Sequence, residues 1–238
     1  MKIDKNSNIY IIVYIALIVV IVGTALAFCS MGLKPRQQAN ANADKMRQIL
    51  ASVRVVPEKD SIAAVFGRIV TDEYAVDWQG NRIAGRNAFG IDVAAQSKLP
   101  EQERLLPVYE ARLADGAVKY VLPVYGSGLW GPIWGYVALD ADAATIYGAF
   151  FSHQGETPGL GAEIAKPAFS DQFEGRSLFK DGAFYPVEVV KKGLKPKSDA
   201  DYVDGVSGGT ITSKGVGEML DNCLRPYENF LLKIKKEN

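Results

Sequence analysis

Residues 119–151 read KYVLPVYGSGLWGPIWGYVALDADAATIYGAFF and contain three segments rich in branched and aromatic side chains. Glycine and serine separate the first segment from the second, and aspartates separate the second from the third. Because short turns of this kind join antiparallel neighbours, the pattern predicts a three-stranded meander. Its strands are expected at Lys119 to Tyr125, Ile133 to Leu139 and Thr145 to Phe151.

Flanking segments complete the predicted domain. Residues 72–110 carry many turn formers, which indicates a meandering segment with short strands. After the meander, Thr157-Pro158 is typical of a helix start, so a helix is expected over Gly159 to Ala168. A further strand is expected at Phe184 to Val190, and helices are expected at Thr212 to Leu224 and, after Pro226, at Tyr227 to Lys236. Adjacent strands with helices grouped elsewhere indicate an α+β fold, in which helices flank a largely antiparallel sheet.

The amino-terminal region is the most apolar part of the chain. Residues 9–33 contain no charged side chain, and a helix of this length spans about 37 Å, enough to cross a hydrocarbon core of about 30 Å. We therefore expect a short tail over residues 1–8, a transmembrane helix over 9–33 and a juxtamembrane stalk helix over 34–58. One soluble domain is expected over 59–238.

Two alternatives to an uncleaved anchor have less support. Ala25-Leu26-Ala27 has the small-x-small form of a signal-peptide cleavage site, but the apolar run is longer than a signal core of about 7–15 residues. A lipoprotein signal normally has a small residue before its cysteine, whereas Phe28 precedes Cys29. Positive charges lie on both sides of the apolar run, so they do not assign the side of the membrane on which the domain lies.

Composition excludes several classes of function. The formal net charge is +0 and there is no basic block, which argues against nucleic acid as a partner. With 2 cysteines and 1 histidine, the chain supports neither a disulfide framework nor a zinc or iron–sulfur cluster, and no metal ligands are expected. No acid–base constellation is evident, so no catalytic residue is predicted.

A glycine-rich segment, DGVSGGTITS at residues 204–213, leads into the predicted carboxy-terminal helix. Glycines let the backbone approach a bulky anion, and the first N–H groups of a helix favour a phosphate. Hydroxyl side chains add further donors, so the segment has the chemistry of a phosphate seat. The alternative is an ordinary loop-to-helix junction capped by a hydroxyl.

Two further segments could border a flat ligand. Residues 154–161, QGETPGLG, place glycines around the predicted helix start, with Leu160 as an apolar platform; a tight strand-to-helix turn is the alternative. Residues 128–136, GLWGPIWGY, offer Trp130 and Trp134 for stacking on a ring system, although aromatic residues beside strands usually belong to the core.

Taken together, these segments resemble the FMN-binding domain family. Ser-Gly-Gly-Thr-x-Thr at residues 207–212 is similar to the family's flavinylation motif, and Glu-Thr-Pro-Gly-Leu-Gly at 156–161 is similar to its second signature. The resemblance implies that Thr210 carries FMN covalently through a phosphoester. It further implies a phosphate seat of Ser207, Gly208, Gly209 and Thr212, an isoalloxazine border of Glu156, Thr157, Leu160 and Gly161, and Trp130 as stacking partner.

The resemblance also implies a cellular role. Members of the family include membrane-anchored subunits of the sodium-translocating NADH:quinone reductase and of the Rnf complex, and the Gly-Leu-Trp segment favours the reductase. The chain would then be a one-electron relay with no complete active site of its own. Its partners would be the other subunits of the complex and a flavin transferase. The domain would lie on the periplasmic side of the bacterial inner membrane.

Two alternatives to this role stay open. One is the Rnf complex, and the other is a non-redox, membrane-anchored binding module whose glycine loop is only a helix cap. One residue also departs from the family pattern, because Gly209 stands where the family usually has alanine. The smaller residue is expected to fit and to leave the loop looser before FMN is attached.

Overall fold

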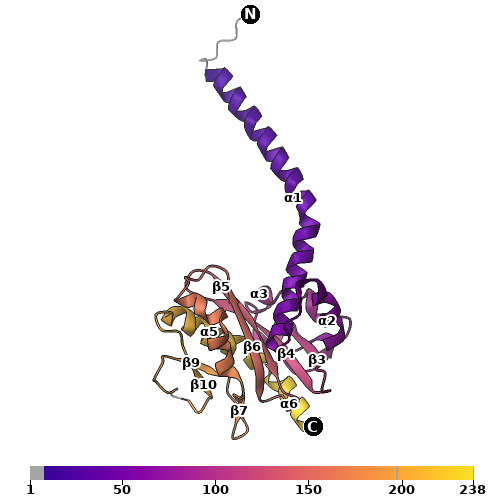
Figure 1. The fold of residues 1–238 in the computed structure, drawn as a ribbon, viewed down its shortest axis with the longest axis vertical. Helices are drawn as coiled ribbons and strands as arrows, with labels where there is room; N and C mark the ends of the chain where they lie inside the picture. Colours follow the sequence, from indigo (N-terminus) through magenta and orange to yellow (C-terminus); the bar gives the residue numbers. More distant parts are fainter. Residues whose placement is uncertain (1–7, 197, 238) are drawn as a thin grey trace, which may run out of the picture. The chain divides into compact units, whose positions relative to one another are not determined.

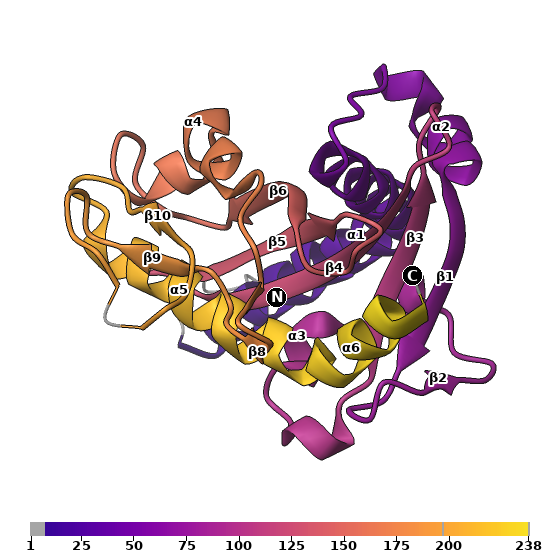
Figure 2. The ribbon, with the colours of Figure 1, turned by 90° about the horizontal axis from the view of Figure 1, so that it is seen from below.

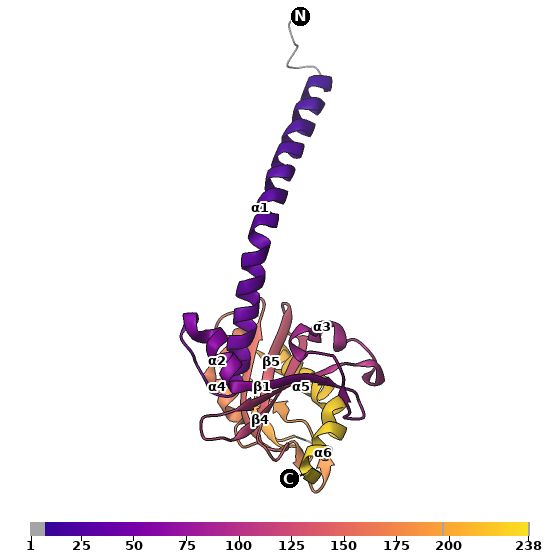
Figure 3. The ribbon, with the colours of Figure 1, turned by 90° about the vertical axis from the view of Figure 1, so that its right-hand side faces the viewer.

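The computed structural model describes residues 8–196 and 198–237. Of the predicted tail, residues 1–7 lie outside this description. The long helix α1 (Asn8–Ser52) covers both the predicted transmembrane helix and most of the predicted stalk, and Figures 1 and 3 show it as one continuous helix. It is long and apolar enough to cross a membrane, which fits a single-pass anchor. The chain divides into one compact unit that ends at Lys45 and another that begins at Met46.

The stalk helix ends six residues before the predicted limit at residue 58. Arg54 adopts a left-handed backbone conformation with φ of 63°. Its N–H donates to Ala51 O at 2.9 Å, and the N–H of Val55 donates to Leu50 O at 2.9 Å. These two bonds form a Schellman motif, which satisfies the last carbonyls of the helix and turns the chain away. Glycine usually occupies the left-handed position, so the arginine gave no sequence signal of a helix end.

The sheet confirms the predicted fold class. Its six strands lie in the order β2-β1-β3-β4-β5-β6, and every neighbouring pair is antiparallel. The three strands of the predicted meander are β4, β5 and β6, each within two residues of its expected limits. The bounds are β1 (Val70–Val76), β2 (Arg82–Ile83), β3 (Leu106–Arg112), β4 (Val118–Ser127), β5 (Pro132–Leu139) and β6 (Ile146–His153).

Smaller elements complete the domain. A parallel pair, β9 (Glu188–Val190) with β10 (Tyr202–Asp204), leads into α5, and β7 (Phe179–Lys180) pairs with β8 (Ala183–Phe184). The α-helices after α1 are α2 (Ile62–Ile69), α3 (Val93–Gln96), α4 (Pro167–Ser170), α5 (Thr210–Leu224) and α6 (Glu228–Glu237). Short 3-10 helices lie at η1 (Lys59–Ser61), η2 (Ala88–Gly90), η3 (Glu101–Glu103), η4 (Gly161–Ala165), η5 (Asp171–Phe173) and η6 (Arg225–Tyr227).

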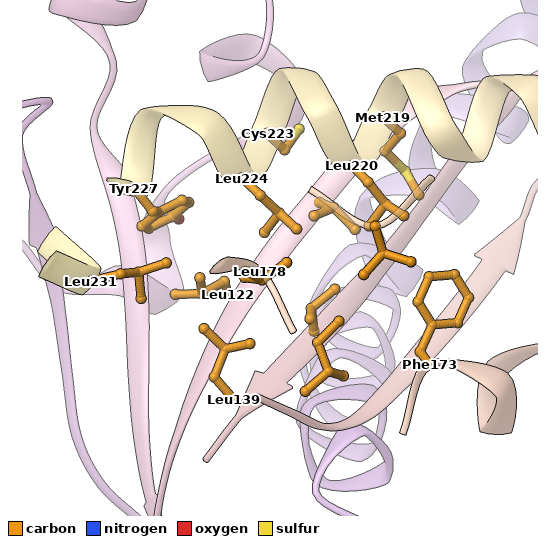
Figure 4. Packing of buried hydrophobic residues seen from close by; sticks show 14 of the residues in the cluster. Leu122, Leu139, Phe173, Leu178, Met219, Leu220, Cys223, Leu224, Tyr227 and Leu231 are labelled. Atoms are coloured by element: carbon orange, nitrogen blue, oxygen red, sulfur yellow. The ribbon is translucent and has the colours of Figure 1, made fainter. Parts of the chain in front are cut away.

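Helices cover both faces of the sheet. Because successive side chains of a strand point to opposite faces, Leu122 and Val121 of β4 belong to two different clusters of buried residues. Leu122 packs in the cluster that includes Leu220 and Leu224 of α5, as Figure 4 shows. Val121 packs with the last turn of α1 and with α2, on the other side of the sheet in Figure 2. The first cluster fixes α5, and therefore its amino end, against β4.

Two predicted elements were wrong. The expected helix over 159–168 is replaced by a turn, η4 and α4, because Gly159 has φ of 75° and Leu160 has φ of −126° and ψ of −116°, neither of which is helical. The expected strand over 184–190 is split into β8 and β9, with Pro186 between them.

Candidate functional site

The glycine-rich segment forms a tight loop between β10 and α5. The N–H of Gly205 donates to Val190 O at 2.7 Å, and the N–H of Gly209 donates to Val206 O at 3.0 Å. The Ser213 hydroxyl accepts a hydrogen bond from the N–H of Val206 at 2.9 Å, so this side chain secures the loop. Gly208 has φ of 78°, a conformation that favours glycine.

Thr210 is the first residue of α5 and its side chain is exposed. The first N–H groups of a helix have no partner inside the helix, and the helix dipole favours negative charge there. The hydroxyl of Thr210 is therefore accessible at a place suited to an anion. Ser207 and Gly208 are exposed beside it, whereas Gly209 and Thr212 are buried.

Glu156 lies at the centre of the site and is only 5% exposed. One carboxylate oxygen accepts the backbone N–H of Trp130 at 2.8 Å, and the other accepts the Thr212 hydroxyl at 2.6 Å. The backbone N–H of Glu156 donates to Nδ1 of His153 at 3.1 Å. Glu156 thus joins the turn after β4, the end of β6 and the first turn of α5.

Glycines make room for this carboxylate. A Cβ on Gly161 would lie 2.3 Å from Oε2 of Glu156 and 2.5 Å from Oγ1 of Thr212, and a Cβ on Gly128 would lie 2.5 Å from Oε1 of Glu156. These distances are far below van der Waals contact. Gly161, one of the glycines predicted to border a ligand, therefore leaves room for the chain's own Glu156.

A cavity of 370 Å³ brings together nine of the ten predicted site residues, all except Ser207. Its apolar side chains are exposed to an unusual extent: Trp130 by 68%, Leu129 by 48%, Leu160 by 43% and Ile211 by 59%. Leu129 and Ile211 were not predicted, although each lies inside a recognised motif next to a predicted residue. The residues that line the cavity are Leu129, Trp130, Glu156, Thr157, Leu160, Gly161, Gly208, Gly209, Thr210, Ile211 and Thr212.

A second cavity, of 520 Å³, meets the first at Gly208 and Thr210. Ser207 lies here, together with Val206 and three lysines, Lys191, Lys192 and Lys214. The two cavities differ in charge, since the first has an apolar rim without lysines and the second combines valines with three lysines. Thr210 is therefore accessible from an apolar and from a basic side.

Trp134 lies outside both cavities. Its indole N–H donates to Oε1 of Gln48 at 3.0 Å, so this tryptophan serves the packing of β5 against α1. Cys223 is also structural: burial raises the pKa of its thiol, and the sulfur accepts a hydrogen bond from the backbone N–H of Tyr125.

The residues present fit FMN. An aromatic and three aliphatic side chains form an apolar rim on which an isoalloxazine could rest. The exposed Thr210 hydroxyl, the adjoining glycine loop and the amino end of α5 offer a place for one phosphate. The basic cavity beside Thr210 adds positive charge on the other side.

Comparison with known proteins agrees with this chemistry. The model of the FMN-binding domain family matches residues 128–225, which include every predicted site residue. NqrC of the Na+-translocating NADH-quinone reductase of Vibrio anguillarum is 31% identical, over 97% of this chain and 95% of its own length. The crystal structure of NqrC from Parabacteroides distasonis has 46% identity and a TM-score of 0.78, over 84% of this chain and 96% of that one. The Shewanella oneidensis NqrC structure has 26% identity and a TM-score of 0.70, over 83% and 99%.

An antiparallel α+β domain and a match to the FMN-binding domain family define a flavin-binding protein, whose apolar amino-terminal helix fits a single-pass membrane anchor. With relatives matched over nearly its whole length, the chain belongs to the NqrC family, whose members are subunits of an oxidoreductase complex, the Na+-translocating NADH-quinone reductase.

Proposed function

We propose that the chain is a redox subunit of a sodium-translocating NADH:quinone reductase and carries FMN as a phosphoester of Thr210. The observation that carries this proposal is the position of Thr210: an exposed hydroxyl at the first residue of α5, on the edge of a cavity with an apolar rim. When bound, FMN would accept and donate electrons one at a time. The chain's own task is to hold the cofactor, orient it and shield it.

Attachment requires a co-reactant and an enzyme. In the proposed step, a flavin transferase uses FAD, and Oγ of Thr210 bonds to the phosphorus of the FMN half. The bond between the two phosphates of FAD breaks, AMP leaves, and the threonine hydroxyl loses its proton. The exposure of Thr210 supports this step, because a second protein must reach the hydroxyl.

Each remaining site residue has a proposed role. Ser207, Gly208, Gly209 and Thr212 surround the attachment point and would seat the phosphate. Glu156, Thr157, Leu160 and Gly161 would border the isoalloxazine, with Trp130 as the stacking partner. Leu129 and Ile211 would extend the apolar border. Together they exclude water from one face of the ring system.

The proposed setting is a bilayer with the domain on the periplasmic side of the bacterial inner membrane. The apolar helix α1 supports the anchor, and the relatives' names support an assembly with other reductase subunits. Relatives that match nearly the whole chain are reductase subunits, which favours this complex over the Rnf complex.

Denaturing gel electrophoresis tests the attachment. The full chain is produced together with an active flavin transferase and viewed under ultraviolet light. A fluorescent band is expected for the wild type, and its loss is expected in Thr210→Ala. Thr71→Ala, which changes an exposed threonine of β1 outside both cavities, should keep the band. A non-fluorescent wild-type band would favour a non-redox binding module instead, provided that the same transferase is shown to modify another substrate.

A further inference from the structure

Glu156 holds an unusual position in the candidate site. Of the lining residues that the structure describes around the 370 Å³ cavity, it is the one with an ionisable side chain. Both of its oxygens accept hydrogen bonds, from the Trp130 N–H and the Thr212 hydroxyl, which is the arrangement expected of a carboxylate. Glu156 therefore places a carboxyl group, held by two hydrogen bonds, in the wall of a cavity whose other lining side chains are not ionisable.

The surroundings strengthen the effect of this charge. Glu156 is 5% exposed, so solvent screens it weakly, and its hydrogen bonds hold it in one position. Gly128 and Gly161 lack the side chains that would exclude it. The low exposure, the two hydrogen bonds and the two glycines thus together place a carboxylate beside the cavity.

We propose that Glu156 sets the reduction potential of the flavin by placing a fixed negative charge next to it. This inference rests on the proposed function of the same site. Negative charge opposes the addition of an electron to a neighbouring group, so Glu156 would lower the potential of the bound FMN. At an effective dielectric constant of about 20, one charge about 12 Å away changes an equilibrium constant by about tenfold, which corresponds to about 59 mV for one electron.

Glu156→Gln is the variant that isolates the charge. Glutamine has the same shape, its oxygen can accept the Trp130 N–H, and its amide can donate to the Thr212 hydroxyl, which is able to accept. Both contacts are therefore kept while the charge is lost. The matched control is Glu163→Gln: Glu163 accepts the Gly159 N–H at 3.1 Å on the same segment, but it does not line the cavity.

The experiment uses the full chain in detergent, loaded by the transferase. Flavin attachment is scored first by in-gel fluorescence, and the midpoint potential is then measured by titration in a spectroelectrochemical cell. In the Glu156→Gln chains that carry flavin, the potential is expected to be higher, by about tenfold in the equilibrium constant for one electron. Glu163→Gln should change that constant by less than about twofold, because its charge is farther from the cavity and more exposed to solvent.

Other results would overturn the inference. An unchanged potential in Glu156→Gln, an equal shift in both variants, or a folded Glu156→Gln chain that takes up no flavin would each reject it. If Glu156→Gln does not fold, Glu156→Asp retains the charge, and a tenfold change in that variant would show that shape rather than charge matters. A wild-type chain that takes up no flavin would reject both the proposed function and the inference. If the wild type and Glu156→Gln both carry flavin and have the same midpoint potential, the inference alone is rejected.

Discussion

The indole N–H of Trp134 donates a hydrogen bond to the side-chain oxygen of Gln48 at 3.0 Å, which joins β5 to the last turns of α1. Gln48 is only 6% exposed, so the bond lies within the packed domain. It fixes the strand that follows the turn carrying Trp130. The same helix that contains the apolar segment therefore ends as a packed part of the redox domain.

Replacing Gln48 by alanine should destabilise the domain by about 1–3 kcal/mol, because the indole N–H would lose its partner in a poorly solvated place. Urea unfolding of the full chain in detergent, followed by tryptophan fluorescence, measures the change. Gln38→Ala, which removes an exposed hydrogen bond to Asn42, should stay within about 0.5 kcal/mol of the wild type. Equal midpoints for the two variants would contradict the importance of the Gln48–Trp134 bond.

Gly161→Ala should damage both stability and flavin loading. The added Cβ would lie 2.3 Å from a Glu156 oxygen, so the carboxylate or the backbone must move, at a cost of about 1–3 kcal/mol. Unfolding midpoints and in-gel fluorescence measure the two effects. Gly155→Ala is the matched control on the same loop, because its Cβ would have 4.0 Å to the nearest atom, the carbonyl oxygen of Trp130. Similar behaviour of the two variants would refute this account of Gly161.

Asp142 should contribute stability that depends on pH. Burial tends to raise its pKa, but hydrogen bonds from the Thr145 hydroxyl and from the N–H groups of Thr145 and Ala144 hold the pKa below its ordinary value of 3.8. The unfolded chain therefore binds the proton more readily, so the stabilisation is complete above pH 3.8 and is lost as the pH falls below it.

Asp142→Asn should accordingly be less stable than the wild type at pH 6, by about 1 kcal/mol because hydrogen bonds to the charged group are lost. The difference should narrow at pH 3. Chemical denaturation at the two pH values measures it. A difference that is constant, or that widens in acid, would show that Asp142 does not act through its ionised form.

Gly209→Ala introduces the residue that the resemblance to the FMN-binding domain family leads us to expect at this position. Its Cβ would lie 3.2 Å from Gly161 N and from Val206 Cβ, which is tight but within reach of small shifts. The φ of −105° suits alanine, and the lower entropy of the unfolded chain offsets the crowding. We expect flavin loading at the wild-type level and a stability change below about 1 kcal/mol, measured by fluorescence and urea unfolding. A large loss of loading would mean that the loop of this chain has adapted to glycine.

Much of the sheet could be predicted because residues 119–151 combine dense β-forming side chains with clear turns. The strand β3 was less evident, since residues 106–112 include Pro107, Glu110 and Arg112 and resemble their surroundings. The helix expected over 159–168 does not form at its start, because Gly159 and Leu160 adopt non-helical backbone angles. The side-chain pattern of a sequence does not report backbone angles of this kind.

The residues of the candidate site were easier to predict from the sequence than the hydrogen bonds between them. The motifs predicted which residues gather around Thr210, and the structure places nine of the ten in one cavity. Sequence could not show that Glu156 and Thr212 bond to each other, because 56 residues separate them. Nor could it show that Gly161 leaves room for the Glu156 carboxylate, since a missing Cβ can admit either a neighbouring side chain or a ligand.

Arg54, which follows α1 in a left-handed conformation, links the end of that helix to residues far along the chain. Local sequence opposes this conformation by about 1–2 kcal/mol, and distant residues support it. The guanidinium forms a paired contact with Glu174, at 2.7 and 2.5 Å, and lies 5.3 Å from the ring centre of Tyr147. Before residues 147 and 174 have been synthesised and folded, these contacts cannot end the helix at Ser52. The end of α1 is therefore reinforced only after the chain as far as Glu174 has been synthesised, which couples this helix end to the later folding of the domain.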